Sequence, residues 1–164
     1  MTDPVTEIRT PIRLEYEYMA SHVQSDFLHA VAQRQLTGHR CPQCSKVYVP
    51  PRGVCPTCSV ATSETVNLPD KGTVTAFCVV NLPFYGQSLE IPYVCASILL
   101  DGADVPIFHL IQEMPADEVR IGLRVEAAWV DDEEMKPNLA SIKHFRPSGE
   151  PDVAIVSKNG SADA

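Results

Sequence analysis

CPQCSKVYVPPRGVCPTC, residues Cys41 to Cys58, contains two C-x-x-C motifs separated by ten residues. Each motif turns the backbone so that two thiolates face one point, and two such motifs complete the closed tetrahedral sulfur cage that structural zinc prefers. We therefore predict a compact zinc ribbon in which one structural Zn²⁺, favoured over iron, is bound by Cys41, Cys44, Cys55 and Cys58.

The alternative uses of these cysteines fit the sequence less well. A pair of disulfides would require an oxidising compartment, and a redox C-x-x-C would need only one motif in a thioredoxin-like βαβ context that the sequence lacks. His39 could in principle replace one ligand, although four sulfurs already fill the site. Because a four-sulfur site has no open coordination position, we expect the metal to stabilise the fold without taking part in chemistry.

The composition is typical of a globular protein. The 164 residues are 45% hydrophobic and 21% charged, which suits one ordinary domain or two small modules and excludes wholesale disorder. The longest apolar run, 91–100, falls short of the roughly 20 residues of a membrane-spanning helix. The first residues lack a basic segment followed by an apolar stretch, so we expect a soluble, cytoplasmic protein.

Alternating apolar residues after residue 70 predict five antiparallel strands, at about 73–81, 93–100, 105–112, 124–130 and 140–145. Asp101-Gly102 fits a hairpin turn, whereas 115–122 is long enough to cross the mouth of a barrel, with a helical turn at about 116–119. This plan matches an OB-fold barrel. A five-stranded sandwich fragment is the alternative.

The region before the cysteines predicts an extended arm followed by a helix. Ser25 and Asp26 suit the start of a helix and Gly38 suits its end, whereas 14–27 fits either a strand or a helix. The predicted fold class is therefore mainly β. Its expected parts are an N-terminal arm and helix (1–38), the zinc ribbon (39–69), a five-stranded OB-fold barrel (70–147) and a flexible tail (148–164).

Charge is unevenly distributed along this chain of net charge −8. Residues 39–60 hold three basic and no acidic side chains, but residues 61–149 hold thirteen acidic and only six basic ones. Neutralisation of phosphates by Lys and Arg supplies most of the affinity for nucleic acids, so the sequence argues against that partner. A single-stranded nucleic-acid-binding module remains the alternative function, because zinc ribbons and OB-folds often have that role.

The remaining reactive side chains form no catalytic motif. Cys78 and Cys95 lie among aliphatic residues in predicted strands, and we interpret them as buried, inert thiols. His109 and His144 have no Ser, Cys or carboxylate at a recognisable catalytic spacing. The run Asp131–Glu134 is typical of a solvated loop. We therefore expect no catalytic residues and no activity of the chain alone.

Six segments occur together in an informative order: Phe27-Leu28 with Ala30, Gly38 to Cys44, Lys46 to Arg52, Cys55 to Cys58, Gly72 to Val74 and Ile121 to Glu126. Together they resemble the bacterial and archaeal family of OB-fold proteins with an N-terminal rubredoxin-like zinc ribbon. The resemblance spans most of residues 15–147. One departure is that serine occupies positions 45 and 59, where such ribbons usually carry glycine.

The resemblance implies a role beside an enzyme of lipid or steroid metabolism. Members of the family typically accompany thiolase-fold enzymes, of the acyl-CoA acyltransferase or steroid side-chain aldolase type, as a non-catalytic subunit needed for activity. The chain is therefore expected to bind such an enzyme in a heterotetramer or larger complex, and to help bind acyl-CoA or order the active site. The candidates for the partner surface and for an acyl-CoA cleft are the turn that contains Pro51 and Arg52 and the loop that contains Phe84 and Tyr85. The alternative for each segment is a packed loop without a binding role. No membrane partner is expected.

Overall fold

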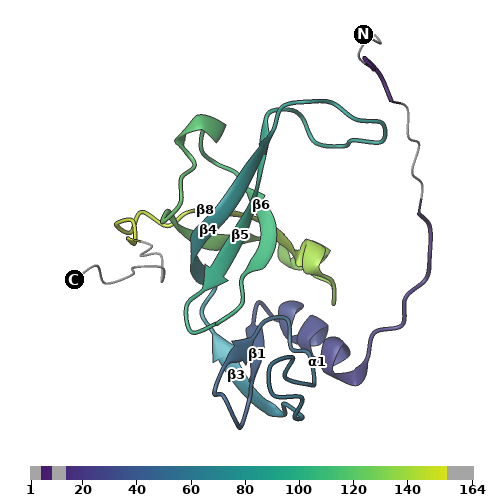
Figure 1. Ribbon diagram of the computed structural model, residues 1–164, viewed down its shortest axis with the longest axis vertical. Helices are drawn as coiled ribbons and strands as arrows, with labels where there is room; N and C mark the ends of the chain where they lie inside the picture. Colours follow the sequence, from purple (N-terminus) through teal and green to yellow (C-terminus); the bar gives the residue numbers. More distant parts are fainter. Residues whose placement is uncertain (1–4, 9–13, 155–164) are drawn as a thin grey trace.

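The computed structural model describes residues 5–8 and 14–154, which form an α-helix, a three-stranded sheet and a closed five-stranded barrel (Figure 1). The fold is mainly β, as predicted. The elements are α1 (His22–Val31), β1 (Leu36–Arg40), β2 (Val47–Tyr48), β3 (Glu64–Leu68), β4 (Lys71–Val80), β5 (Tyr93–Leu100), β6 (Ile107–Ile111), η1 (Ala116–Glu118), β7 (Arg124–Trp129), η2 (Asp132–Glu134), η3 (Leu139–Ser141) and β8 (Ile142–Pro147).

Helix α1 begins earlier and ends earlier than predicted. Ser21 caps it, because its hydroxyl accepts from the backbone amide of Gln24 and the Gln24 side chain accepts from the Ser21 amide, which forms a capping box. The prediction that Ser25 starts the helix was therefore wrong. Among residues 5–8 and 14–154 no helix is long and apolar enough to cross a membrane.

Gly38 lies inside strand β1 and does not end the helix. In the sheet, β1 pairs antiparallel with both β2 and β3. A Cβ atom at Gly38 would lie 2.8 Å from Cγ1 of Val47 and 3.0 Å from the carbonyl oxygen of Tyr48. Glycine is needed at this position because the neighbouring chain passes so closely.

The barrel has the strand order β4-β5-β6-β8-β7, and β7 closes it by pairing with β4. The expected OB-fold is confirmed, including the tight Asp101-Gly102 connection and the helical turn η1. The prediction that all five strands pair antiparallel was wrong at one place. Strands β6 and β8 pair in parallel, with Ile111 opposite Phe145.

One apolar core joins the helix, the sheet and the barrel. It includes Phe27 of α1, Leu36 of β1, Val49 beside β2, Ile98 of β5 and Phe145 of β8, all buried. The two modules therefore share buried apolar surface, and each stabilises the other through it.

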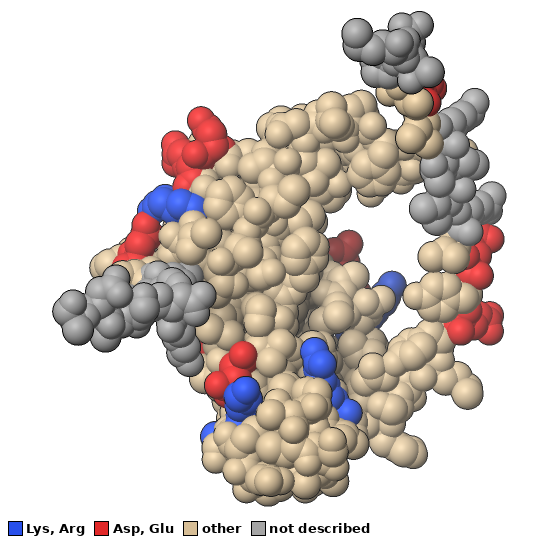
Figure 2. Space-filling model, in the orientation of Figure 1, with Lys and Arg blue, Asp and Glu red and all other residues tan. Residues whose placement is uncertain are grey.

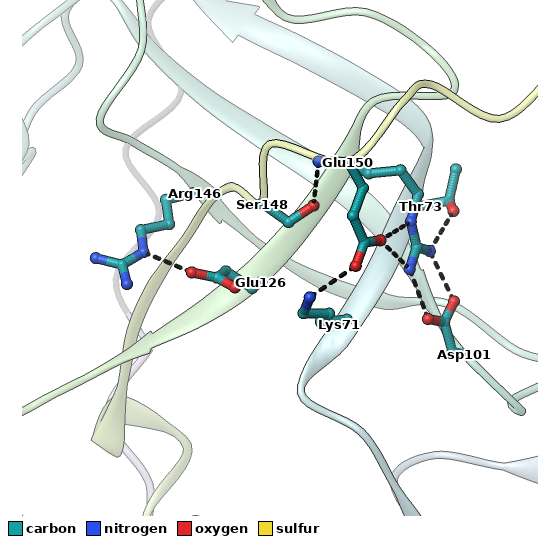
Figure 3. A network of polar contacts seen from close by, with 8 residues as sticks. Lys71, Thr73, Asp101, Glu126, Arg146, Ser148 and Glu150 are labelled. Atoms are coloured by element: carbon teal, nitrogen blue, oxygen red, sulfur yellow. Dashed lines mark hydrogen bonds and ion pairs between the residues drawn. The ribbon is translucent and has the colours of Figure 1, made fainter.

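Hydrogen bonds and ion pairs attach the segment 148–153 to the barrel. The guanidinium of Arg124, a side chain only 10% exposed, donates to Asp101 at 2.6 and 2.7 Å and to Glu150 at 2.9 Å (Figure 3). Lys71 contacts the same Glu150 carboxylate at 2.6 Å. The amide of Val153 also donates to the carbonyl of Gly122 at 2.9 Å. The predicted tail thus starts with a segment held in place, and residues 155–164 lie outside the described residues.

Candidate metal centre

The structure brings together the four cysteines that the sequence predicts as ligands. Their Sγ atoms all lie within 4.8 Å of one another, and those of Cys44 and Cys55 are 3.7 Å apart. A tetrahedral Zn²⁺ with Zn–S bonds of about 2.3 Å requires sulfurs roughly 3.8 Å apart. The four sulfurs therefore fit a structural zinc ion, and Cys41 and Cys55 are completely buried.

Both C-x-x-C motifs are followed by the tight backbone turn of a zinc ribbon, even though serine replaces glycine at positions 45 and 59. Ser45 and Ser59 have φ angles of 61° and 57°. Their amides donate to the carbonyls of Cys41 and Cys55 at 2.9 and 2.8 Å. The departure noted in the sequence therefore leaves the turn intact, at the cost of placing two L side chains in the left-handed region.

Amide groups and one hydroxyl surround the sulfurs. The amide of Cys44 points at Cys41 Sγ, and that of Cys58 points at Cys55 Sγ, each at 3.4 Å. The Tyr48 hydroxyl lies 3.3 Å from Cys55 Sγ. Burial raises the pKa of Cys55, but the hydrogen bonds from Tyr48 and the amides outweigh it and lower the pKa to about 6. These hydrogen bonds stabilise the thiolate form of Cys55, which is the form that binds a metal ion.

His39 is not part of the sulfur cluster. Its Nδ1 lies 2.8 Å from the carbonyl oxygen of Thr62, to which it donates in the matching tautomer. The only group of ligand side chains close enough to hold a metal, among residues 5–8 and 14–154, consists of the four cysteines. A site closed by four sulfurs supplies folding free energy and no reactive position.

Asp104, in the connection between β5 and β6, attaches the ribbon to the barrel. Its carboxylate accepts from the amide of Val47 at 2.8 Å, and its own amide donates to the Val47 carbonyl at 2.9 Å. The next residue, Val105, packs against the cluster formed by Cys41, Tyr48 and Cys55. Nothing in the sequence marked Asp104 for this role, because its partner lies 57 positions away.

A cavity of about 180 Å³ lies between the ribbon and the barrel. Its wall is mostly apolar, and the polar side chains Arg52 and His109 also line it. Arg52 is exposed, with its guanidinium carbon 5.9 Å from the centre of the Tyr48 ring, whereas the neighbouring Pro51 is buried. Burial lowers the pKa of His109, so its imidazole is neutral near pH 7.

The loop between β4 and β5 carries exposed apolar side chains. Leu82 is 79% exposed, Phe84 is 58% exposed and Tyr85 is fully exposed. In Figure 1 this loop extends away from the barrel at the end opposite the ribbon. The loop that carries Phe84 and Tyr85 therefore lies far from the turn that carries Arg52, so the two candidate segments belong to separate surfaces.

The other residues singled out in the sequence are dispersed. His144 is buried and its Nε2 lies 2.8 Å from Glu113, whereas His109 contacts the ring of Phe145. The prediction that Cys78 and Cys95 are buried was wrong, because Cys78 is exposed and Cys95 is half-buried. The four acidic residues from 131 to 134 are exposed, as expected for a solvated loop.

Two family models match adjoining parts of the chain. The rubredoxin-like zinc ribbon domain of ChsH2 matches residues 28–64, and the C-terminal OB-fold domain of ChsH2 matches residues 65–130. A DUF35 domain-containing scaffold protein of Methanocaldococcus jannaschii is 32% identical over 117 residues, which are 71% of this chain and 82% of the relative. A scaffold protein of the same description from Methanothermobacter thermautotrophicus is 33% identical over 62% of this chain and 76% of its own.

Solved structures have the same fold. The Ltp2–ChsH2(DUF35) aldolase contains a chain that matches 80% of this one over 98% of its own length, with a TM-score of 0.60 and 24% identity. A DUF35-family protein of unknown function from Sulfolobus solfataricus matches 77% of this chain over 84% of its own, with a TM-score of 0.57 and 17% identity.

Proposed function

Because the chain belongs to the DUF35 family, in which a zinc ribbon is joined to an OB-fold domain, we propose that it is a non-catalytic accessory subunit of a thiolase-fold enzyme. Relatives in two archaea are named scaffold proteins, and one structural neighbour belongs to an aldolase with two named components. A scaffold role beside a partner enzyme is the general form of the proposal. Its specific form is a partner of the acyl-CoA acyltransferase or aldolase type.

The observation that carries the proposal is one uncharged face of the barrel, over β5, β6 and the neighbouring part of β4. Side chains alternate along β5, so that Val94 and Ala96 point into the core while Cys95 and Ser97 point outward. On β6 the outward neighbours are Leu110 and Phe108, which is 67% exposed. In Figure 2 the middle of the molecule, over the strands labelled β4, β5 and β6 in Figure 1, is free of coloured side chains. We call this surface the barrel face.

The barrel face favours a protein partner over a nucleic acid. OB-folds bind oligonucleotides with their second and third strands, here β5 and β6, and with flanking loops. Neither strand contains a Lys or Arg, and the β7–β8 connection holds the four acidic residues 131–134. Polyanions require basic side chains at such positions. Apolar area without charge is instead what the centre of a protein interface presents.

The exposed loop extends the barrel face. Phe84 and Tyr85 lie in the loop that follows the last residue of β4, Val80. Aromatic side chains of this kind supply a large share of the binding free energy at interfaces. The proposed interface with the enzyme therefore consists of the barrel face together with Leu82, Phe84 and Tyr85.

The cavity beside the ribbon supports a second, more specific part of the proposal, that the chain helps to hold acyl-CoA. The apolar wall suits an extended aliphatic arm, and the exposed guanidinium of Arg52 at the cavity suits an anionic group at the end of that arm. A second hollow of about 360 Å³ is also lined by Arg52, together with Ser21 and Gln24.

Co-expression with thiolase-fold enzymes of the source genome, followed by size-exclusion chromatography, tests the scaffold role. We expect a stable complex for the wild type and loss of that complex for the double variant Phe84→Ala/Tyr85→Ala. The exposed Ile121, in the connection between β6 and β7, provides the matched control Ile121→Ala, which should still assemble. Separate elution of the wild type and every candidate enzyme would contradict the proposal.

Calorimetry with acyl-CoA thioesters tests the ligand. Binding to the isolated chain or its complex should weaken about tenfold in Arg52→Gln, since an exposed charge-assisted hydrogen bond contributes roughly 1.5 kcal/mol. Lys46→Gln is the control, because Lys46 is also exposed and belongs to the same ribbon but does not line the cavity. Equal weakening in both variants would point to general electrostatics and exclude a specific role for Arg52.

A further inference from the structure

Cys78 and Cys95 lie directly opposite each other on neighbouring antiparallel strands. The register of β4 and β5 pairs Phe77 with Ala96, Cys78 with Cys95 and Val79 with Val94. Ala96 and Val94 are buried in the core, so the pair between them points to the other side of the sheet, on the barrel face. Cys78 is exposed and Cys95 is half-buried, and both thiols are free.

Opposed positions of this kind are within reach of a disulfide. Directly opposite residues in an antiparallel pair have Cα atoms about 4.5 or 5.5 Å apart, depending on the hydrogen-bonding position. Both values fall inside the range of roughly 4.4 to 6.8 Å observed across disulfides. The two side chains can therefore be joined without a change in strand register.

The pair is separate from the metal centre. The four ribbon cysteines lie at residues 41–58, whereas this pair lies in the barrel hairpin beside the loop 81–92. Burial raises the pKa of the Cys95 thiol, and the nearby Cys78 raises it further. Because Cys78 is the more exposed of the two thiols, it is the one expected to react first.

We infer that Cys78 and Cys95 form a dithiol modification site, which low-molecular-weight disulfides such as glutathione disulfide convert into a cross-strand disulfide. The Cys78 thiolate attacks one sulfur of glutathione disulfide, forms a mixed disulfide and displaces one glutathione thiolate. The Cys95 thiolate then attacks the Cys78 sulfur, which breaks the mixed disulfide and displaces the second glutathione. Two protons leave the protein thiols and yield two molecules of reduced glutathione.

The product closes a covalent ring around the loop that connects β4 and β5. That ring contains the exposed Phe84 and Tyr85, so oxidation restricts the motion of the segment that carries them. This inference concerns thiol chemistry alone and stands whether or not the chain binds an enzyme or acyl-CoA.

Mass spectrometry of the zinc-loaded chain after incubation with glutathione disulfide tests the site. The wild type should lose the mass of two hydrogens without retaining glutathione. Digestion after glutamate, which cuts at Glu90 between the two cysteines, should release linked peptides 65–90 and 91–113 under non-reducing conditions. Cys95→Ser should stop at the mixed disulfide on Cys78.

The double variant Cys78→Ser/Cys95→Ser separates this reaction from oxidation of the metal centre. It should retain zinc and remain unmodified under the same conditions. The oxidised wild type should also unfold at a higher temperature than the reduced form, and the double variant should show no such difference. A wild type that accumulates glutathione on Cys78, or a linkage that involves the ribbon cysteines, would overturn the inference.

Discussion

The side chain and the amide of Asp104 bind both backbone groups of Val47. The carboxylate accepts from the Val47 amide at 2.8 Å, and the Asp104 amide donates to the Val47 carbonyl at 2.9 Å. A residue between two barrel strands thereby occupies the open edge of β2. The sheet β2-β1-β3 is thus fixed to the barrel by hydrogen bonds as well as by the shared core.

Replacing Asp104 with Ala should lower the free energy of unfolding by about 1 to 2 kcal/mol. The reason is that the amide of Val47, at the edge of β2, loses its charged hydrogen-bond acceptor. Asp104→Asn keeps an oxygen acceptor and should lose less. Urea unfolding followed by circular dichroism measures the difference. If both variants matched the wild type, the contact would contribute nothing to docking of the ribbon.

The purified chain should contain one zinc per molecule by elemental analysis. Removing the metal with a chelator should unfold the ribbon, because binding of structural zinc and local folding are one equilibrium. Cys55→Ser removes a completely buried ligand and should prevent stoichiometric binding. Bound iron, or six freely titratable thiols in the untreated chain, would contradict the assignment.

Tyr48→Phe should weaken zinc affinity by about tenfold or more, since it removes a hydroxyl that points at the Cys55 sulfur at 3.3 Å and leaves the ring in place. Competition with a chromogenic chelator measures the affinity. Tyr93→Phe is the matched control, because Tyr93 lies on the barrel and contacts no metal ligand among the described residues. Equal affinities for Tyr48→Phe and the wild type would exclude the proposed support of Cys55.

Ser45→Gly should raise the free energy of unfolding by about 0.5 to 1 kcal/mol. The left-handed backbone at φ 61° costs a serine roughly 1 to 2 kcal/mol, and the greater freedom of glycine in the unfolded chain offsets part of the gain. Ser63→Gly, outside the left-handed region, should lower stability. Thermal unfolding of the zinc-loaded variants distinguishes them. A loss of stability in both would show that the turn at Ser45 is not strained.

Stability should fall in acid partly through Glu150. Hydrogen bonds from Lys71 and Arg124 hold the pKa of this carboxyl below its ordinary value of 4.5. Its contribution is therefore complete above that value and is lost as the pH falls through the lower, folded-state pKa. Glu150→Gln should reduce the slope of stability against pH below about pH 5. Lys71→Met should reduce it too, and an unchanged slope in both would contradict the assignment.

The cluster of four cysteines was predictable because the chemistry of zinc requires cysteine at short, fixed spacings, which a sequence displays directly. Strand β5 was equally clear, since the burial of alternate residues from Tyr93 to Leu100 matches its apolar pattern. Strand β1 was missed because LTGHR has no such alternation and becomes a strand through its partners β2 and β3. The parallel pairing of Ile111 with Phe145 likewise depends on closure of the barrel.

The prediction that Cys78 and Cys95 are buried failed for a different reason. A register shift between Val74 and Ala76 interrupts the alternation of β4, and three successive residues, Ala76, Phe77 and Cys78, are exposed beyond it. Apolar residues at the end of a hairpin have the same sequence signature as a buried strand. Only the arrangement of the neighbouring strands distinguishes the two cases.

The shared core has a consequence for how this architecture can evolve. A recombination event between residues 64 and 65, where the two matching family models adjoin, would separate Phe27 and Leu36 from Ile98 and Phe145. Each fragment would then expose to water the part of the apolar core that the other fragment had covered. The ribbon and the barrel should therefore be inherited together. Related proteins should differ by substitutions at their surfaces more often than by exchange of one module.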